Sequence, residues 1–487
     1  MGAAPLATSL ATSPATPAAK SSNPEWKPTG ETAADLQGIA ISAYPEHLFA
    51  MLLLVRFPAP SVAAPNDWVA HLAPRVTDST GKRDICLNLA FAAAGLVVLG
   101  VPKEVWATFS LPFQQGMTTA DRARFLGDNP DSWRWSDCGS NPNCVHAQLM
   151  IYTRTRSDLD SVVAAEMATV AGFGLTLAGQ ILMQVNLDAE GERHEHFGFA
   201  DGISQPILVD GKIPVERRAL HEIPAGEIVL GQGNTYDIPA AGPVVPPSPV
   251  AAQFLKPAAT EGFFDLGLNG TYMVCRQLMQ DVAKFWNNMK AASADLLDEN
   301  RNAATDEWLA QKTVGRTLEG DMLTPTGPAS GNDMTFFASD PAGFGCPITS
   351  HVRRANPRDG LAPTTKDKQG MIDATNRHRI LRRGRIYGTP ITNRYVDDGV
   401  DRGLVFLCLN SEIERQFEFV QHTWLLNPMF GGGYNEGDPL ISPRCPFSIP
   451  SKPVRQQPII ETFITPVGGG YFFLPSVRAL HYLGALG

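Results

Sequence analysis

The sequence predicts an α+β protein whose two halves resemble each other. Two observations lead to this prediction. The order of apolar, strand-like segments and amphipathic, helix-like segments in the first half of the chain recurs in the second half. In addition, 44 glycines and 39 prolines indicate many structured connections between these elements. With 487 residues, the chain is long enough for one large domain or two ordinary domains with a hydrophobic core.

Two strands and two helices are expected in the first half. A continuous apolar run over residues 48–57 is typical of a buried strand, and residues 146–153 alternate like a strand. Residues 85–99 are expected to form a helix that packs through small side chains, and residues 157–170 an amphipathic helix. In this last helix, the expected capping pair is Ser157 and Asp160, and the expected apolar face is Leu159, Val163, Met167 and Val170.

The second half repeats this order of elements. Strands are expected over residues 270–275 and 404–409, and helices over residues 278–289 and 411–424. In the last helix, the expected capping box is Ser411 with Glu414, and the expected apolar face is Ile413, Phe417, Val420 and Trp424.

Three long segments rich in glycine and proline interrupt these elements, at residues 240–257, 324–347 and 431–458. Loops of this length either shape a pocket or lie disordered. Because the second segment leads directly to His351, we expect it to shape a pocket. The first 30 residues are rich in Ala, Pro, Ser and Thr, and this composition predicts a disordered tail.

Charge and hydropathy exclude several classes of function. A formal net charge of −9 argues against a nucleic-acid partner, which requires a basic face. The longest apolar runs are shorter than the roughly 18 to 20 residues that cross a bilayer, so no membrane association is expected. The N-terminus lacks a basic start followed by an apolar core, so it does not resemble a secretory signal. A small-molecule partner is therefore expected.

The seven cysteines are thinly spread along the chain. This odd number fits reduced thiols in a cytoplasm better than a disulfide framework, and we expect a cytoplasmic protein. Cys138 and Cys144, six positions apart in a polar segment, could still form a disulfide.

The segment His-Phe-Gly-Phe-Ala-Asp-Gly-Ile-Ser-Gln-Pro at residues 196–206 contains the first candidate site residue, Asp201. An isolated Asp-Gly pair is most often a turn. Here aromatic and aliphatic neighbours, including Phe199, predict that the carboxylate lies against apolar side chains, where an acid without a partner is costly. Gly198 and Gly202 lack a Cβ, so a flat ligand could approach the backbone closely.

The segment Cys-Pro-Ile-Thr-Ser-His-Val-Arg-Arg-Ala-Asn-Pro-Arg at residues 346–358 contains the second candidate, His351. A neutral histidine is a usual proximal ligand of haem iron, and the nearby Arg353, Arg354 and Arg358 suit the two propionates of a haem. A single histidine is more often structural, and a solvated basic turn has the same composition. The two segments together indicate a haem site, in which Phe199 and Gly202 also contact the cofactor.

Other groups of residues have less specific interpretations. His194 and His196 could bind one metal ion, but no third ligand follows at a useful spacing. The basic run at residues 377–385 would, by composition alone, form a charged strand edge. No Cys-x-x-Cys-His segment is present, so any haem is expected to bind without thioether links.

Several of these segments resemble the dye-decolourising peroxidase family of haem enzymes. Residues 198–202, Gly-Phe-Ala-Asp-Gly, match the GxxDG motif of that family, and the following Gly-Ile-Ser-Gln-Pro is also similar. The resemblance extends over residues 35–480, with further similar stretches in the same order at residues 35–38, 266–272, 346–353, 380–384 and 415–421.

The resemblance implies two ferredoxin-like domains with antiparallel sheets. It predicts a tail over residues 1–34, an N-terminal domain over residues 35–190 and a C-terminal domain with long loops over residues 191–487. Haem b, which is iron protoporphyrin IX, would be bound without a covalent link, mainly by the C-terminal domain.

By the same resemblance, His351 would be the proximal iron ligand, Asp201 the distal acid-base group and Arg382 the distal arginine. The family pattern has this arginine two positions before a glycine, which selects Arg382 although Arg383 is adjacent. In these roles, Asp201 would transfer a proton between the two oxygens of hydrogen peroxide, and Arg382 would stabilise the developing negative charge.

The implied activity is that of a haem peroxidase, which reduces hydrogen peroxide and oxidises dyes, phenolics and other small or bulky organic donors in one-electron steps. Two alternatives remain open, a haem carrier or sensor without peroxide turnover and a haem-free hydrolase that uses Asp201. The protein could act as a homo-oligomer.

Two further roles cannot be assigned to single residues. The expected anionic partners for the second ring nitrogen of His351 are Glu412, Glu414 and Glu418. The tryptophans that could relay electrons from bulky donors, although core packing is the expected role of each, are Trp133, Trp135, Trp286, Trp308 and Trp424.

Overall fold

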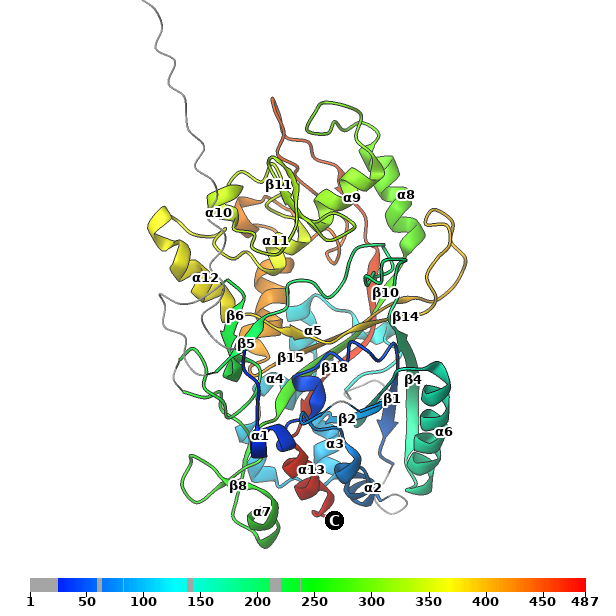
Figure 1. Ribbon diagram of the computed structural model, residues 1–487, viewed down its shortest axis with the longest axis vertical. Helices are drawn as coiled ribbons and strands as arrows, with labels where there is room; N and C mark the ends of the chain where they lie inside the picture. Colours follow the sequence, from blue (N-terminus) through cyan, green and yellow to red (C-terminus); the bar gives the residue numbers. More distant parts are fainter. Residues whose placement is uncertain (1–24, 59–63, 82, 138–142, 211–219, 237) are drawn as a thin grey trace, which may run out of the picture.

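The computed structural model describes residues 25–58, 64–81, 83–137, 143–210, 220–236 and 238–487 (Figure 1). Part of the segment that was expected to be a tail has defined structure. Glu25 forms a β-bridge with Val209, and helix α1 spans Gly30–Asp35. Residues 1–24 of the predicted tail, and Cys138 of the predicted cysteine pair, lie outside the described residues.

The first half of the chain forms a four-stranded antiparallel unit. Its strands follow the order β2-β3-β1-β4 in space, with helix α2 between β1 and β2 and helix α6 between β3 and β4. This βαββαβ connectivity is the ferredoxin-like arrangement. The bounds are β1 Phe49–Arg56, α2 Pro65–Leu72, β2 Ile85–Phe91, β3 Ala147–Thr153, α6 Arg156–Gly172 and β4 Thr176–Gln184.

The second half has the same connectivity, with strand order β18-β10-β15-β14. Helix α8 follows β10, and two π-helical segments, η8 and η9, lie between β15 and β18. The predicted α+β fold with antiparallel sheets is confirmed. The bounds are β10 Thr271–Gln280, α8 Val282–Ser293, β13 Leu381–Arg382, β14 Arg385–Tyr387, β15 Gly403–Asn410, η8 Glu414–Glu418, η9 Val420–Leu425 and β18 Ile464–Leu474.

The two units share one sheet. Strand β14 pairs with β4, and β18 pairs with β2, so the strands of both halves form a continuous nine-stranded sheet. Because β10 also pairs with β15, the sheet closes on itself. Alternate side chains of β1 pack into two different apolar clusters: Leu53 belongs to one cluster and Leu52 to the other. Because both faces of the strand are buried in this way, its sequence is apolar throughout.

Helices α8 to α12 lie at one end of the molecule, and α2 and α13 lie at the other (Figure 1). The elements not yet described are short. The helices are α3 Ala93–Val98, α4 Leu111–Gln115, α5 Ala120–Leu126, α7 Pro249–Phe254, α9 Asp306–Val314, α10 Phe336–Ser339, α11 His351–Ala355, α12 Lys368–Asn376 and α13 Val477–Gly484. The strands are β5 Ile207–Val209, β6 Glu222–Pro224, β7 Val244–Val245, β8 Lys256–Pro257, β9 Phe264–Asp265, β11 Met322–Thr324, β12 Gly327–Ala329, β16 Cys445–Pro446 and β17 Ile459–Ile460.

Two expected elements differ from the structure. The helix expected over residues 85–99 is strand β2 followed by the short helix α3, because β2 is paired along its length with β3 and is buried on both faces. A segment that is buried on both faces is apolar throughout, so its hydrophobic periodicity does not distinguish a strand from a helix. The strand expected over residues 270–275 continues to Gln280, so the following helix begins at Val282 rather than at residue 278.

The two amphipathic helices were predicted in the right places, but their caps differ. Helix α6 begins at Arg156, where the hydroxyl of Thr155 accepts a hydrogen bond from the Asp158 amide, and Met167 on its expected apolar face is 37% exposed. The hydroxyl of Ser411 donates to the carbonyl of Glu227 instead of capping the second helix. That helix is π-helical over most of its length, a form that is frequent at functional sites.

Among the described residues, no helix is both long enough and apolar enough to span a bilayer.

Candidate active site

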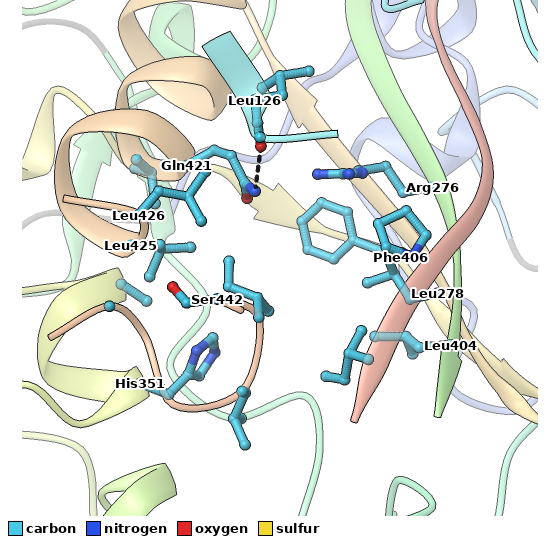
Figure 2. Close-up of a pocket in the computed structure, with 18 of the residues that line it drawn as sticks. Leu126, Arg276, Leu278, His351, Leu404, Phe406, Gln421, Leu425, Leu426 and Ser442 are labelled. Atoms are coloured by element: carbon cyan, nitrogen blue, oxygen red, sulfur yellow. Dashed lines mark hydrogen bonds between the residues drawn. The ribbon is translucent and has the colours of Figure 1, made fainter. Parts of the chain in front are cut away.

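A cavity of about 1110 Å³ lies beside the sheet of the second half. Figure 2 shows Leu278, Leu404 and Phe406 on the strand side of this cavity, and His351 and Leu425 on its helical side. The volume exceeds the roughly 300 to 1,000 Å³ of typical small-molecule pockets. The cavity can therefore hold a large, mainly apolar ligand.

His351 is the first residue of α11, and a buried carboxylate fixes its ring. The Nδ1 atom lies 2.9 Å from Oδ2 of Asp438, whose side chain is fully buried. A carboxylate at this distance accepts a hydrogen bond, so we assign the proton to Nδ1 and the lone pair to Nε2. In the part of the chain that the structure describes, no group forms a hydrogen bond with Nε2. The imidazole is thus prepared to bind a metal ion through Nε2.

The partner of His351 is therefore Asp438, and the prediction of Glu412, Glu414 or Glu418 was wrong. The carboxylate of Glu418 instead accepts hydrogen bonds from Arg122 and from the Tyr471 hydroxyl. Asp438 lies in the third long loop, 87 positions after His351. The only signal in the sequence was the length of this loop, since loops of this length either shape a pocket or lie disordered.

The loop that contains Asp201 also lines the cavity, together with Phe199 and Gly202. Gly198 has φ +101° and Gly202 has φ +81°, in the left-handed region that favours glycine. A Cβ at either position would meet no atom within 4 Å, so the backbone conformation, rather than crowding, requires glycine here. Oδ1 of Asp201 accepts a hydrogen bond of 2.6 Å from the Gly202 amide. The side chain is thereby held at the start of the turn.

Two arginines hold the far side of this loop by its carbonyl groups. Nη2 of Arg382 donates to the carbonyl of Ile203 over 2.5 Å, and Nη2 of Arg379 donates to the carbonyl of Ser204 over 2.8 Å. Both arginines line the cavity. The adjacent Arg383 donates to the carbonyls of Ile39 and Ile41 and does not line it. Of the two neighbours, Arg382 is the one that faces the site.

The three arginines that follow His351 do not line the cavity. Arg353 donates to the carbonyls of Asp340 and Cys346, and Arg354 donates to several carbonyls of the η9 region. Arg358 donates to the Met334 carbonyl. All three are buried, and they satisfy loop carbonyls that have no partner in a helix or sheet. Their guanidinium groups are thus engaged by the chain itself, and their contact with a cofactor stays a prediction.

Arg316 and Arg379 are the buried guanidinium groups that line the cavity near Arg382. Burial, together with the charges of Arg358 and Arg382, lowers the pKa of Arg379 to about 9, and burial also lowers the pKa of Arg316. Nη1 of Arg379 has no hydrogen-bond partner among the described residues. Such a group of buried cations favours an anionic ligand. The sequence signal was the basic run at residues 377–385, whose composition had suggested only a strand edge.

No protein-family model matches the chain, but single known proteins do. The multifunctional dye peroxidase of Amycolatopsis is 30% identical over 424 residues, which cover 82% of each protein. The chain belongs to the dye-decolourising peroxidase family. A dye-decolourising peroxidase of Mycena epipterygia is 28% identical over 450 residues, which cover 82% of this chain and 76% of the relative.

Solved structures confirm the fold of this dye-decolourising peroxidase. The crystal structure of an Anabaena peroxidase of the same type superimposes with a TM-score of 0.72 at 22% identity, and covers 94% of this chain and 95% of that chain. The chain is thus a peroxidase of the dye-decolourising, haem-dependent family. Nothing in these comparisons favours a haem carrier.

The other candidates from the sequence have structural partners in the peroxidase. His194 contacts Asp188 and the Gly198 carbonyl, and His196 contacts the Tyr387 carbonyl. Within the described ranges, no cluster of three histidine, cysteine or acidic residues is arranged to hold a metal ion. Among the predicted relay residues, Trp308 is half-buried, and the buried ones are Trp133, Trp135, Trp286 and Trp424.

Proposed function

We propose that this peroxidase binds haem b without a covalent link through Nε2 of His351, and that Asp201 and Arg382 promote the reduction of hydrogen peroxide. The observation that supports this proposal is the shared cavity. It is lined by an imidazole fixed by a carboxylate, by a second carboxylate and by a guanidinium group. The donors would be phenolics and dyes, oxidised in one-electron steps.

The residues present fit a haem. The free Nε2 of His351 suits the iron, and Arg316 and Arg379 suit the two propionates because both are buried cations beside the cavity. Leu404 and Phe406 offer apolar contacts to the porphyrin. When bound, the haem supplies an iron that binds peroxide and accepts its oxidising equivalents.

Asp201 would move the proton. Its Oδ1 is engaged by the Gly202 amide, so Oδ2 is the atom that accepts a proton from one peroxide oxygen and returns it to the other, which leaves as water. The guanidinium group of Arg382 donates hydrogen bonds and has no acceptor, so it would stabilise the negative charge that develops as the O–O bond breaks. The bond from Arg382 to the Ile203 carbonyl holds this charge next to the Asp201 loop.

Asp438 would tune the imidazole. A buried carboxylate on Nδ1 increases the electron density at Nε2 and fixes the orientation of the ring. Both effects would favour the binding of iron by Nε2 of His351.

Two substitutions test these roles. D201N should leave the haem absorption spectrum unchanged and lower the rate of reaction with peroxide by about 10²- to 10⁴-fold, since general acid-base catalysis of this kind contributes that much. H351A should lose iron ligation while its far-ultraviolet circular dichroism stays as in the wild type. A D201N variant that reduces peroxide at the wild-type rate would contradict the assignment of the base.

The domain boundary at residues 190 and 191, the cytoplasmic location and assembly into a homo-oligomer stay predictions. Removal of the cofactor by acid extraction, followed by recovery of activity on adding haem b, would test the proposed non-covalent binding.

A further inference from the structure

Glu195 is a second carboxylate on the wall of the cavity, and the proposed mechanism does not use it. Its carboxylate accepts three hydrogen bonds. Oε2 accepts from the Phe197 amide over 2.9 Å and from Nε2 of Gln280 over 2.7 Å, and Oε1 accepts from the Phe199 amide over 2.9 Å. Each carboxylate oxygen therefore binds a different backbone N–H group of the segment that leads to Asp201.

These bonds close a tight turn from its inner side. Within the same turn, the Gly198 amide donates to the Glu195 carbonyl, and the Glu195 amide donates to the Phe199 carbonyl. Gln280 is the last residue of β10, so its bond to Glu195 ties the turn to the sheet of the second half. The conformation of the turn and its position on the sheet both depend on this carboxylate.

The loop around Asp201 is thus held from two sides by opposite charges. On its N-terminal side, amide groups donate to the anionic Glu195, and on its C-terminal side, the carbonyls of Ile203 and Ser204 accept from Arg382 and Arg379. We propose that Glu195 is a positioning residue that holds the Asp201 carboxylate where the peroxide step requires it. This inference rests on the proposed role of Asp201 as the proton acceptor.

A carboxylate at this position has an electrostatic cost. Burial raises the pKa of Glu195, the charge of Asp201 raises it further, and the three hydrogen bonds oppose this shift. A glutamine would avoid that cost, but it offers only one acceptor oxygen, whereas the two backbone amides bind to different oxygens. The need for two acceptors explains why an acid is present beside another acid.

The test compares E195Q and E195A with D201N and with the control E166Q. Glu166, on helix α6, is also a buried carboxylate, but it pairs with Arg75 and does not line the cavity. In the haem-free protein, amide hydrogen exchange measured by mass spectrometry should rise in the segment 195–202 of both Glu195 variants and should not change in E166Q. This readout does not depend on the activity of the loaded enzyme.

In the haem-loaded enzyme, stopped-flow measurement should give a rate constant for the reaction with peroxide about 10- to 100-fold lower in E195A, because a small misplacement of a catalytic group costs this much. The haem spectrum should match the wild type. Q280L, which keeps both amide bonds, should slow the reaction less than E195A. E195Q keeps most of the side-chain volume and tests the inference if E195A does not fold.

Formate distinguishes positioning from simple damage. This small carboxylate can occupy the space left in E195A and accept the two amide bonds, so it should restore part of the peroxide rate in E195A and none in E195A/D201N. Equal restoration in the double variant would overturn the inference, because formate would then act as the base itself. If both Glu195 variants reacted with peroxide at the wild-type rate while D201N reacted slowly, the role of Glu195 would be refuted and the role of Asp201 would stand. A fast D201N would overturn the proposed function.

Discussion

Replacing Asp438 by asparagine tests whether this carboxylate sets the tautomer of His351. In the structure, Oδ1 of Asp438 accepts hydrogen bonds from the amides of Leu440 over 2.9 Å and Ile441 over 3.2 Å, while Oδ2 faces Nδ1 of His351. Asparagine has only one acceptor oxygen, and two backbone amides compete for it with one imidazole. The oxygen is therefore expected to remain with the amides, so the NH₂ group faces the ring.

An NH₂ group donates and cannot accept, so Nδ1 of His351 must become an acceptor and the proton must move to Nε2. That tautomer has no lone pair for iron. The opposite orientation of the amide would leave two buried N–H groups without partners, at about 1 to 3 kcal/mol each. We expect haem affinity to fall about 10- to 100-fold, the usual cost of losing such a partner of a metal ligand. This corresponds to about 1.4 to 2.8 kcal/mol.

The assay is the rate and extent of haem transfer from each holoenzyme to an excess of apomyoglobin, followed in the Soret band. The matched control is D137N, because Asp137 is also a buried aspartate that accepts from two backbone amides, and it does not line the cavity. D438N should lose haem faster than both the wild type and D137N. Haem retention and a Soret spectrum identical to those of the wild type would refute the reasoning, since the carboxylate would then have no influence on the ligand.

Two further predictions concern stability and the cofactor. Burial raises the pKa of Asp137 to about 6, so folding stability contributed by this group should fall as pH rises from about 4 to 6 and stay constant above. In D137N, this loss of about 3 kcal/mol in the free energy of unfolding should be absent. Chemical denaturation of the wild type and D137N at pH 4 and pH 7 measures the loss. If the two proteins differed in free energy of unfolding by the same amount at both pH values, the prediction would be contradicted. R379M should weaken the binding of haem but not of its dimethyl ester, which lacks the propionate charges, as measured by titration of the haem-free protein. Equal weakening for both ligands would exclude a contact between Arg379 and a propionate.

Much of the local structure could be predicted from the sequence. Strands β1, β3 and β15 and helix α6 were found from runs and periods of apolar side chains, because a half-buried helix or a buried strand leaves such a pattern in its own residues. The motif around Asp201 was equally visible. The glycines of its turn have positive φ angles. Because this backbone conformation favours glycine, it can be recognised from a short stretch of sequence.

Only the tertiary structure decided which distant groups meet. Strand β2 was mistaken for a helix because its burial depends on neighbours from elsewhere in the chain. The way in which the long loops pack over the sheet brings Asp438 to His351. The same packing places Arg316 and Arg379 at the cavity, whereas Arg353 and Arg354 do not line it. Sequence patterns report what each segment buries, whereas a site is made by segments whose relative positions depend on packing of the whole chain.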